Sequence, residues 1–416
     1  MNAPINAAAS ADIDGRYAWL RLVVSVALSA VGGVGTWAVI VVLPAVQAEF
    51  GTDRGQASLA YTATMLGFAA GNALGGRAID RFGFVRPALG AALMLGAGFL
   101  LAAHARSIEQ FTLVQGLLIG IGSAATFGPL IADISHWFVR RRGIAVAIAA
   151  AGNYLAGAVW PATMPPFILS YGWRSTYIMI GLFCLASMIP MVLCLRRRLA
   201  LAAETSVAAH RARKVSLNIA PGRLQLLLVA AGIGCCTAMS MPQVHLVAYC
   251  MDLGYGVARG AEMLSLMLAA GIVSRVASGF VADRIGGIAT ALIGSMLQCI
   301  SLLLYLPFDG LASLYIVSFV FGLSQGGIVP CYAIIVRETM PAVEAGRRVG
   351  IVIMATVIGM ALGGWLSGWI YDLTGSYQLA FLNGIAFNLV NMSILSFLYW
   401  RARPALPVAG GAAAAG

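Results

Sequence analysis

The feature that most constrains this chain is a series of apolar runs, each about 20 residues or longer, separated by short polar turns. A run of that length lets an α-helix cross the hydrocarbon core of a bilayer. Lipid permits only helices or closed barrels, and continuous rather than alternating apolar runs exclude a barrel. Charged residues make up 10% of the chain, against about 25% in a soluble domain. The sequence therefore predicts an all-α polytopic membrane protein.

We count twelve such runs, with six on each side of one long basic stretch. The runs are 19–46, 56–76, 83–103, 109–133, 143–169, 175–195, 223–250, 257–281, 286–307, 310–336, 348–371 and 376–400. The expected organisation is an N-terminal tail 1–18, a six-helix bundle 19–195, a central loop 196–222, a second six-helix bundle 223–400 and a C-terminal tail 401–416. The first tail lacks the hydrophobic core of a signal peptide.

The arginines are distributed unequally between the two sides of these runs. Of 26 Lys and Arg residues, 21 fall on the side of the two termini, and four fall on the other side: Arg54, Arg106, Arg174 and Arg259. Basic residues stay cytoplasmic, so we expect both termini in the cytoplasm. We also expect the chain to lie in a bacterial-type inner membrane, as a monomer. The net charge of +11 is then explained by this bias, and we expect the lipid bilayer as a partner and no nucleic acid.

The two halves of the chain repeat each other. The pattern G-x-x-x-D-R-x-G occurs at 76–83 and again at 279–286, and Pro129 corresponds to Pro330. Two similar six-helix halves with a site between them are the plan of many secondary transporters. The charged turns after the second and eighth runs are therefore expected to form a cytoplasmic gate, together with the basic start of the fifth run. This gating set is Asp80, Arg81, Asp283, Arg284, Arg140 and Arg141.

Arg275 is the one basic residue that we place at depth inside an apolar run. A charge at that depth is costly and marks a functional site by default, although the side chain could also extend towards the interface. The planar guanidinium suits a carboxylate, which predicts a small organic anion as the substrate. Polar residues in other runs could bind the substrate or only another helix: Tyr332, Asn153, Tyr154, Gln243, His245 and Tyr61. His245 could also carry a proton, or it could simply pack.

Other classes of function find little support in the sequence. We find no catalytic arrangement, no phosphate loop and no metal-ligand cluster, and the seven cysteines show no paired spacing. We therefore expect no enzyme activity, no cofactor and no metal. A membrane sensor needs an output domain, and the longest polar stretch is 196–222. Efflux of an amphipathic compound is the alternative within transport.

The segment Gly75–Arg86 resembles the loop signature of the major facilitator superfamily, which implies twelve helices and alternating access. Asp14–Trp19, Trp137–Gly152 and the position of Arg275 resemble the monocarboxylate porter and oxalate–formate exchanger branch. That branch implies proton symport first and anion exchange second. One departure is that Gly271 stands where many monocarboxylate porters have an Asp, one turn before the arginine. The lysines that relatives carry in the first or eleventh span are also missing.

Overall fold

The computed structural model describes residues 13–138, 140–197 and 215–404. The side chains of Asp80, Arg142, Val215, Ser216, Ala342, Val343, Arg403 and Pro404 also lie outside this description. Most of the predicted tails 1–18 and 401–416 and of the central loop 196–222 is therefore outside the described residues. So is the side chain of one member of the predicted gating set, Asp80.

The first part of the chain, which we call the N-half, is built of helices α2 to α9. They are α2 (Arg16–Gly32), α3 (Val34–Phe50), α4 (Arg54–Phe82), α5 (Val85–Ala103), α6 (Ile108–Val114), the π-helical turn η1 (Gln115–Gly120), α7 (Ile121–Ala124), α8 (Gly128–Trp137) and α9 (Arg142–Cys194). Each helix pairs its own backbone N–H and C=O groups, and its apolar side chains can therefore face lipid.

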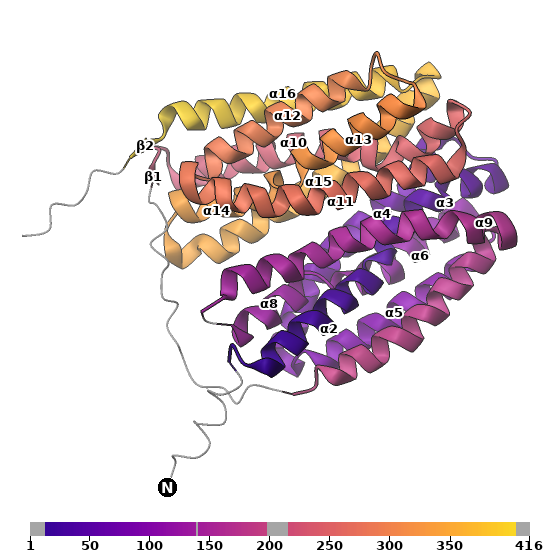
Figure 1. The fold of residues 1–416 in the computed structure, drawn as a ribbon, viewed down its shortest axis with the longest axis horizontal. Helices are drawn as coiled ribbons and strands as arrows, with labels where there is room; N and C mark the ends of the chain where they lie inside the picture. The colour runs from indigo at the N-terminus through magenta and orange to yellow at the C-terminus, as the bar shows by residue number, and fades with distance from the viewer. Residues whose placement is uncertain (1–12, 139, 198–214, 405–416) are drawn as a thin grey trace, which may run out of the picture.

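The second part, the C-half, begins after the short strand β1 (Val215–Ser216). Its helices are α10 (Pro221–Asp252), α11 (Gly256–Ile285), α12 (Gly287–Leu304), α13 (Leu311–Gln325), α14 (Ile328–Thr339), α15 (Ala342–Thr374) and α16 (Gln378–Arg401). Strand β2 (Arg403–Pro404) then pairs antiparallel with β1. Figure 1 shows the two halves as neighbouring groups of long helices, with the N-half in indigo and magenta.

The described helices account for all twelve predicted spans. Ten helical stretches are long and apolar enough to cross a membrane. One of them is α9, which contains two spans because Gly172, with a φ of +77°, interrupts it between the predicted runs. The less apolar helix α4 supplies the second span. The predicted fold is thus confirmed, with run limits that differ from the helix ends by a few residues.

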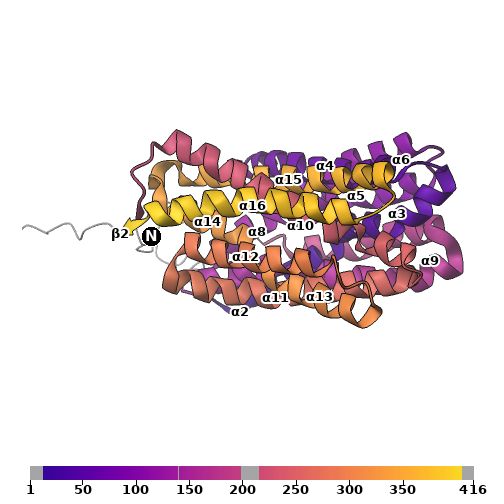
Figure 2. The ribbon, with the colours of Figure 1, turned by 90° about the horizontal axis from the view of Figure 1, so that it is seen from above.

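The helices run roughly along one axis, so the molecule has two ends (Figures 1 and 2). Helix α2 begins, and β2 lies, at the end that we call the terminal end. The opposite end carries Arg54 at the start of α4 and Asp252 at the end of α10, and we call it the Arg54 end.

The structure corrects one detail of the repeated motif. The sequence suggests a charged turn, but Arg81 lies in the last turn of α4 and Arg284 in the last turn of α11. Only the final glycines turn the chain, Gly83 with a φ of +75° and Gly286 with a φ of +91°. The helix continues beyond the apolar run because charged side chains can reach water there without breaking backbone hydrogen bonds. A positive φ then favours glycine and ends the helix.

The fourth and tenth spans are broken at equivalent places. Helix α7 ends at Ala124 and α8 begins at Gly128, just before Pro129. Helix α13 ends at Gln325 and α14 begins at Ile328, just before Pro330. Proline is tolerated in the first turn of a helix because its missing N–H has no partner there. The shared break is the structural form of the repeat seen in the sequence, and it places the Gly326 carbonyl outside the regular helix.

Candidate anion site

Arg275 bridges the two halves instead of extending towards lipid. Its Nε donates to the carbonyl oxygen of Gly326 at 3.3 Å, and its Nη1 donates to that of Ala150, in the N-half, at 3.2 Å. The guanidinium also lies over the ring of Tyr154, 4.4 Å from its centroid. The side chain is half-buried. These contacts from α9 and from the α13–α14 break hold the charge between the halves.

The ring beneath the guanidinium occupies space that Gly271 leaves free. A Cβ atom on Gly271 would lie 2.6 Å from Cε1 of Tyr154, a distance that real contacts do not show. On the neighbouring α13–α14 break, a Cβ on Gly326 would lie 2.2 Å from the carbonyl oxygen of Gly271. Both glycines therefore permit close packing of α11 with its neighbours. The departure from the monocarboxylate pattern has a structural counterpart, because Tyr154 stands where a side chain at 271 would project.

Arg275 forms no ion pair with a carboxylate of the described residues. A guanidinium has five N–H donors, and two backbone carbonyls take only two of them. A cation–π contact is an attraction to a neutral ring and does not cancel the charge. The position can therefore accept an anion and hold it with further donors.

Two other predicted site residues lie near this position. Asn153 is adjacent to Tyr154 on α9, and its backbone carbonyl accepts a hydrogen bond from Trp37 Nε1. Gln243, on α10, donates through Nε2 to Oε1 of Gln325 at 2.5 Å. Gln325 directly precedes the glycine whose carbonyl binds Arg275, so this amide pair is one residue along the chain from a contact of the guanidinium. Sequence reasoning missed Gln325, although a glutamine inside the apolar run 310–336 was a visible signal.

Tyr332 and Tyr61 are fully buried in different surroundings. The hydroxyl of Tyr332 donates to Asn391 Oδ1 at 2.7 Å, inside the C-half. Asn391 in turn donates to Ser295 Oγ, so Tyr332 belongs to a polar network among C-half helices. Tyr61, in α4, lies against Gly364 of α15 at the contact of the two halves, and its hydroxyl has no partner. A role for either in substrate binding stays a prediction.

His245 lies on α10 and faces the Arg54 end rather than Arg275. Its Nε2 is 2.7 Å from the carbonyl oxygen of Gly364, and its Nδ1 is 3.1 Å from the hydroxyl of Tyr377. A carbonyl can only accept, so Nε2 carries the proton in the neutral ring and Nδ1 accepts from Tyr377. The tyrosine oxygen itself accepts from Arg54 Nη1 at 3.0 Å. His245 is thus the inner member of a polar chain that reaches the surface.

Arg54 closes one end of the molecule. Its guanidinium makes two hydrogen bonds to Asp252, at 2.5 and 2.9 Å, and lies 3.9 Å from the ring centroid of Tyr371. The carboxylate of Asp372 accepts the backbone N–H groups of Arg54 and Gly55, where a helix N-terminus favours negative charge. Arg54 belongs to the N-half and its partners to the C-half. We call Arg54, Asp252, Asp372 and Tyr377 the Arg54 lock.

The sequence contained a signal for this lock that we did not use. Arg54 is one of only four basic residues on the side with few positive charges, and Asp252 and Asp372 fall in turns on that same side. Because few charged residues lie on that side, an arginine and an aspartate there are expected to pair. The pairing still required knowing that the start of α4 meets the ends of α10 and α15.

The predicted gating residues lie at the opposite, terminal end. Arg81, Arg140, Arg141, Asp283 and Arg284 are all exposed there. Among the side chains that the structure describes, the hydrogen bonds between the halves lie at the Arg54 end, at mid-depth between Thr62 and Ala361, and at Arg275. A gating role for these exposed residues stays a prediction. Their exposure fits a conformation that is open at the terminal end and shut at the Arg54 end.

The buried guanidinium of Arg21 was not expected, because we had assigned this residue to the cytoplasmic side of the first span. Arg21 on α2 is 2% exposed and binds both carboxylate oxygens of Asp133 on α8, at 2.8 and 2.9 Å. It also donates to the Leu195 carbonyl and lies over the Trp137 ring. All these partners belong to the N-half. Arg21 therefore ties helices of one half together, whereas Arg275 connects two halves.

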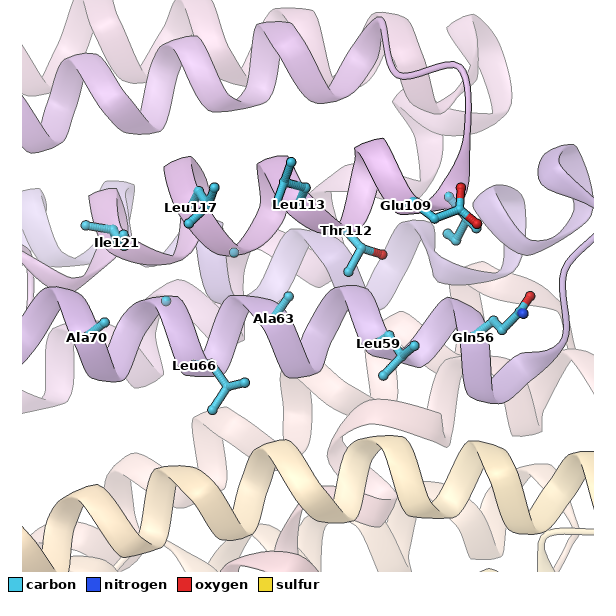
Figure 3. Close-up of a pocket in the computed structure, with 13 residues that line it drawn as sticks. Gln56, Leu59, Ala63, Leu66, Ala70, Glu109, Thr112, Leu113, Leu117 and Ile121 are labelled. Atoms are coloured by element: carbon cyan, nitrogen blue, oxygen red, sulfur yellow. The ribbon is translucent and has the colours of Figure 1, made fainter.

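A separate apolar groove lies on the N-half, between α4 and the α6–η1 segment (Figure 3). It has a volume of about 670 Å³, and its lining is mostly aliphatic, with Gln56 and Glu109 at one end. No residue of the Arg275 site lines it. Its lining offers no cation to an organic anion, so we do not assign the substrate to it.

Comparison with known proteins agrees with this architecture. The family model described as Major Facilitator Superfamily matches residues 26–311 and 263–415. Monocarboxylate transporter 13 of Bos taurus is 30% identical over 330 residues, which cover 78% of this chain and 76% of the relative. Monocarboxylate transporter 13 of Rattus norvegicus is 29% identical over 307 residues, covering 73% and 70%.

Among solved structures, the fold is similar to that of a bacterial homologue of the human lysosomal transporter Spinster in an inward-facing and occupied conformation. The TM-score is 0.70 at 12% identity, and the match covers 92% of this chain and 97% of that one. At this identity the likeness concerns the fold alone. The family match and the twelve spans agree with this fold. The chain belongs to the major facilitator superfamily, a family of membrane transporters and not of enzymes.

Proposed function

We propose that this secondary transporter carries a small organic anion of the monocarboxylate kind by alternating access. The observation that carries the proposal is Arg275, a half-buried guanidinium between the halves that has no carboxylate partner among the described residues. Charge and planar geometry suit a carboxylate. Similarity to proteins named monocarboxylate transporters supports the same substrate class.

The two ends of the molecule support alternating access. The Arg54 lock joins the halves at one end, and the gating residues are exposed at the other. With both termini cytoplasmic, as we propose from the arginine distribution, this conformation is open to the cytoplasm. A carboxylate bound to Arg275 would neutralise the charge that this side chain places between the halves at mid-depth. Closure around the neutral pair then becomes less costly, because an unpaired charge in a low dielectric is strongly disfavoured.

Proton symport is the coupling that we propose first, because His245 acts on the Arg54 lock. In the neutral ring, Tyr377 donates to Nδ1 of His245 and accepts from Arg54. A proton on Nδ1 would force the Tyr377 hydroxyl to turn and would put an imidazolium beside the arginine on the same oxygen. Like charges at that distance repel. Protonation of His245 would therefore favour opening of the Arg54 end.

Anion exchange is the second candidate, and one observation favours it. Tyr154 occupies the space at Gly271, so no titratable carboxylate stands beside Arg275 in the described part of the chain. An empty site would keep its positive charge until another anion arrives. Exchange of one anion for another avoids reorientation of that empty state.

The test uses purified protein in proteoliposomes and short-chain monocarboxylates such as propionate and butyrate. We expect uptake by the wild type, and loss of uptake in Arg275→Ala and Arg275→Lys without loss of insertion, because an ammonium cannot replace the planar fork. Arg259→Lys is the matched control, since Arg259 is exposed and pairs with Glu262 on its own helix. Normal uptake by Arg275→Lys would contradict the assignment. Uptake that ignores a pH gradient but responds to internal carboxylate would exclude symport.

The proposed orientation in a bacterial-type inner membrane has its own test. Cys194 is exposed at the end of α9, on the terminal side, and the other six cysteines are buried. A membrane-impermeant maleimide should therefore leave intact cells unlabelled and label the protein after permeabilisation. Labelling of Cys194 in intact cells would reverse the orientation. Sedimentation in detergent tests the proposal that the protein is a monomer.

A further inference from the structure

Two buried glutamines, one of which is the sequence neighbour of an Arg275 contact, leave polar atoms without partners. Gln243 is 1% exposed and Gln325 is fully buried, and one hydrogen bond joins their amides. The remaining atoms, Oε1 of Gln243 and Nε2 of Gln325, have no hydrogen-bond partner. The count does not depend on how the amides are oriented, because turning both groups over again leaves one NH₂ and one carbonyl unpaired.

The pair lies on the Arg54 side of Arg275. Tyr255, at the start of α11, donates to the Asp309 carbonyl before α13, so these helices share one level at that end. At 1.5 Å per residue, Gln243 is about 14 Å from the end of α10, Gln325 about 21 Å from the start of α13 and Arg275 about 28 Å from the start of α11. The arginine side chain leans towards the helix start, where its Nε reaches the carbonyl next to Gln325.

A third unpaired polar atom lies further along the same direction. The hydroxyl of the fully buried Tyr61 has no partner. A Cβ atom on Gly364 would lie 2.8 Å from the Tyr61 ring and 3.3 Å from Val244, so both side chains lie against Gly364. Val244 is the neighbour of Gln243. The unpaired groups thus continue from Arg275 towards the Arg54 lock, on helices of both halves.

Leaving these atoms unpaired costs free energy, because a buried polar group of this kind has lost its hydrogen bonds to water and forms none in the protein. A bound molecule that supplies the missing partner would remove this cost. Gln243 and Gln325 together present one acceptor and one donor. The group that satisfies both is one that donates and accepts, such as a hydroxyl or a carboxamide.

We propose that Gln243 and Gln325 form a second polar subsite, which binds a hydroxyl or amide group of a substrate whose carboxylate is held by Arg275. The inference rests on the proposed function. It defines the cargo as a bifunctional molecule, with an anionic end and a neutral hydrogen-bonding end. An acid with a purely aliphatic chain would leave the two amides unpaired and would bind more weakly.

The experiment measures competition for uptake by paired acids that differ in one hydroxyl. The pairs are propionate with 2-hydroxypropionate and with 3-hydroxypropionate, and butyrate with 4-hydroxybutyrate. In the wild type, at least one hydroxy acid should bind about tenfold more tightly than its parent. The double variant Gln243→Met, Gln325→Met keeps the length of both side chains and removes both amides. In this variant the affinities for the hydroxy acid and for its parent should become equal.

A purely structural role for the amides would change stability or expression, but it would not change the ratio between two acids. Gln298→Met is the control, because Gln298 is a buried glutamine whose Nε2 donates to the Cys235 carbonyl within the C-half. It should keep the wild-type preference. Equal affinities for every pair in the wild type, or an unchanged preference in the double variant, would overturn the subsite. Absence of any carboxylate uptake by the wild type would overturn the proposed function instead.

Discussion

Removing the charge of Asp252 should open the Arg54 end. Asp252→Asn keeps the size of the side chain but weakens its two hydrogen bonds with Arg54. Hydrogen bonds to charged groups contribute about 1.5–3 kcal/mol. The Arg54 and Asp252 side chains are 14% and 29% exposed, so solvent screening reduces the loss to about 1–2 kcal/mol. A change of that size alters the ratio of closed to open molecules by about 5- to 30-fold.

The assay is the labelling rate of a cysteine introduced into the closed interface. Ser58 is 1% exposed on α4, and its Oγ would lie 2.7 Å from a Cβ on Gly368 of the C-half. Ser58→Cys, made together with Cys194→Ser to remove the exposed thiol, reports opening through its reaction with a polar maleimide. The same protein without Ser58→Cys measures any reaction of the buried native thiols.

Glu262→Gln is the matched control for this experiment. Glu262 lies at the same end and loses the same charge, but both of its partners, Arg259 and Tyr315, belong to the C-half. We expect Asp252→Asn to raise the labelling rate of the introduced thiol about 5- to 30-fold, in proportion to the open population, and Glu262→Gln to leave it unchanged. If both variants react like the parent, or both react faster, the lock is not what holds this end closed.

Two further predictions concern packing and a buried ion pair. Gly271→Ala should lower stability by about 1–3 kcal/mol, because the new methyl group overlaps the Tyr154 ring, and the same change should cost much less in a Tyr154→Ala background; a single variant as stable as the wild type would refute the contact. Asp133→Asn should cost about 3–5 kcal/mol, because it leaves the buried Arg21 without its countercharge. Arg21→Met combined with Asp133→Leu should then melt at a higher temperature than Asp133→Asn alone, and the reverse order would contradict this reading.

The fold could be predicted because the length of an apolar run in a membrane protein is almost the length of its helix. Charges or turn residues separate the runs, and the loop 196–222 divides them in the middle. The predicted helix ends were less accurate than the predicted number of spans. Helix α4 continues to Phe82, beyond the run that ends at 76, because its last turns lie where polar side chains can meet water.

The site was predictable in part. Arg275 stood out because so few charges lie inside the runs, but its protein partners are the backbone carbonyls of Ala150 and Gly326, which no residue type reveals. Spans that are apolar all round also carry no amphipathic signal for which face a polar residue occupies. Tyr332 therefore could not be assigned to the interior of the C-half, nor His245 to the Arg54 end, before the helices were placed.

The tyrosine beneath Arg275 has an electrical consequence. Where a carboxylate accompanies such an arginine, the empty carrier is neutral at that point; here Tyr154 supplies attraction without charge. The loaded site would carry no net charge, and the empty site would carry one positive charge. A unit charge that crosses the full membrane field gains or loses about 2.3 kcal/mol per 100 mV. Through this site, the membrane voltage would thus act on the return of the empty carrier, and the loaded step would sense it only through a proton on His245.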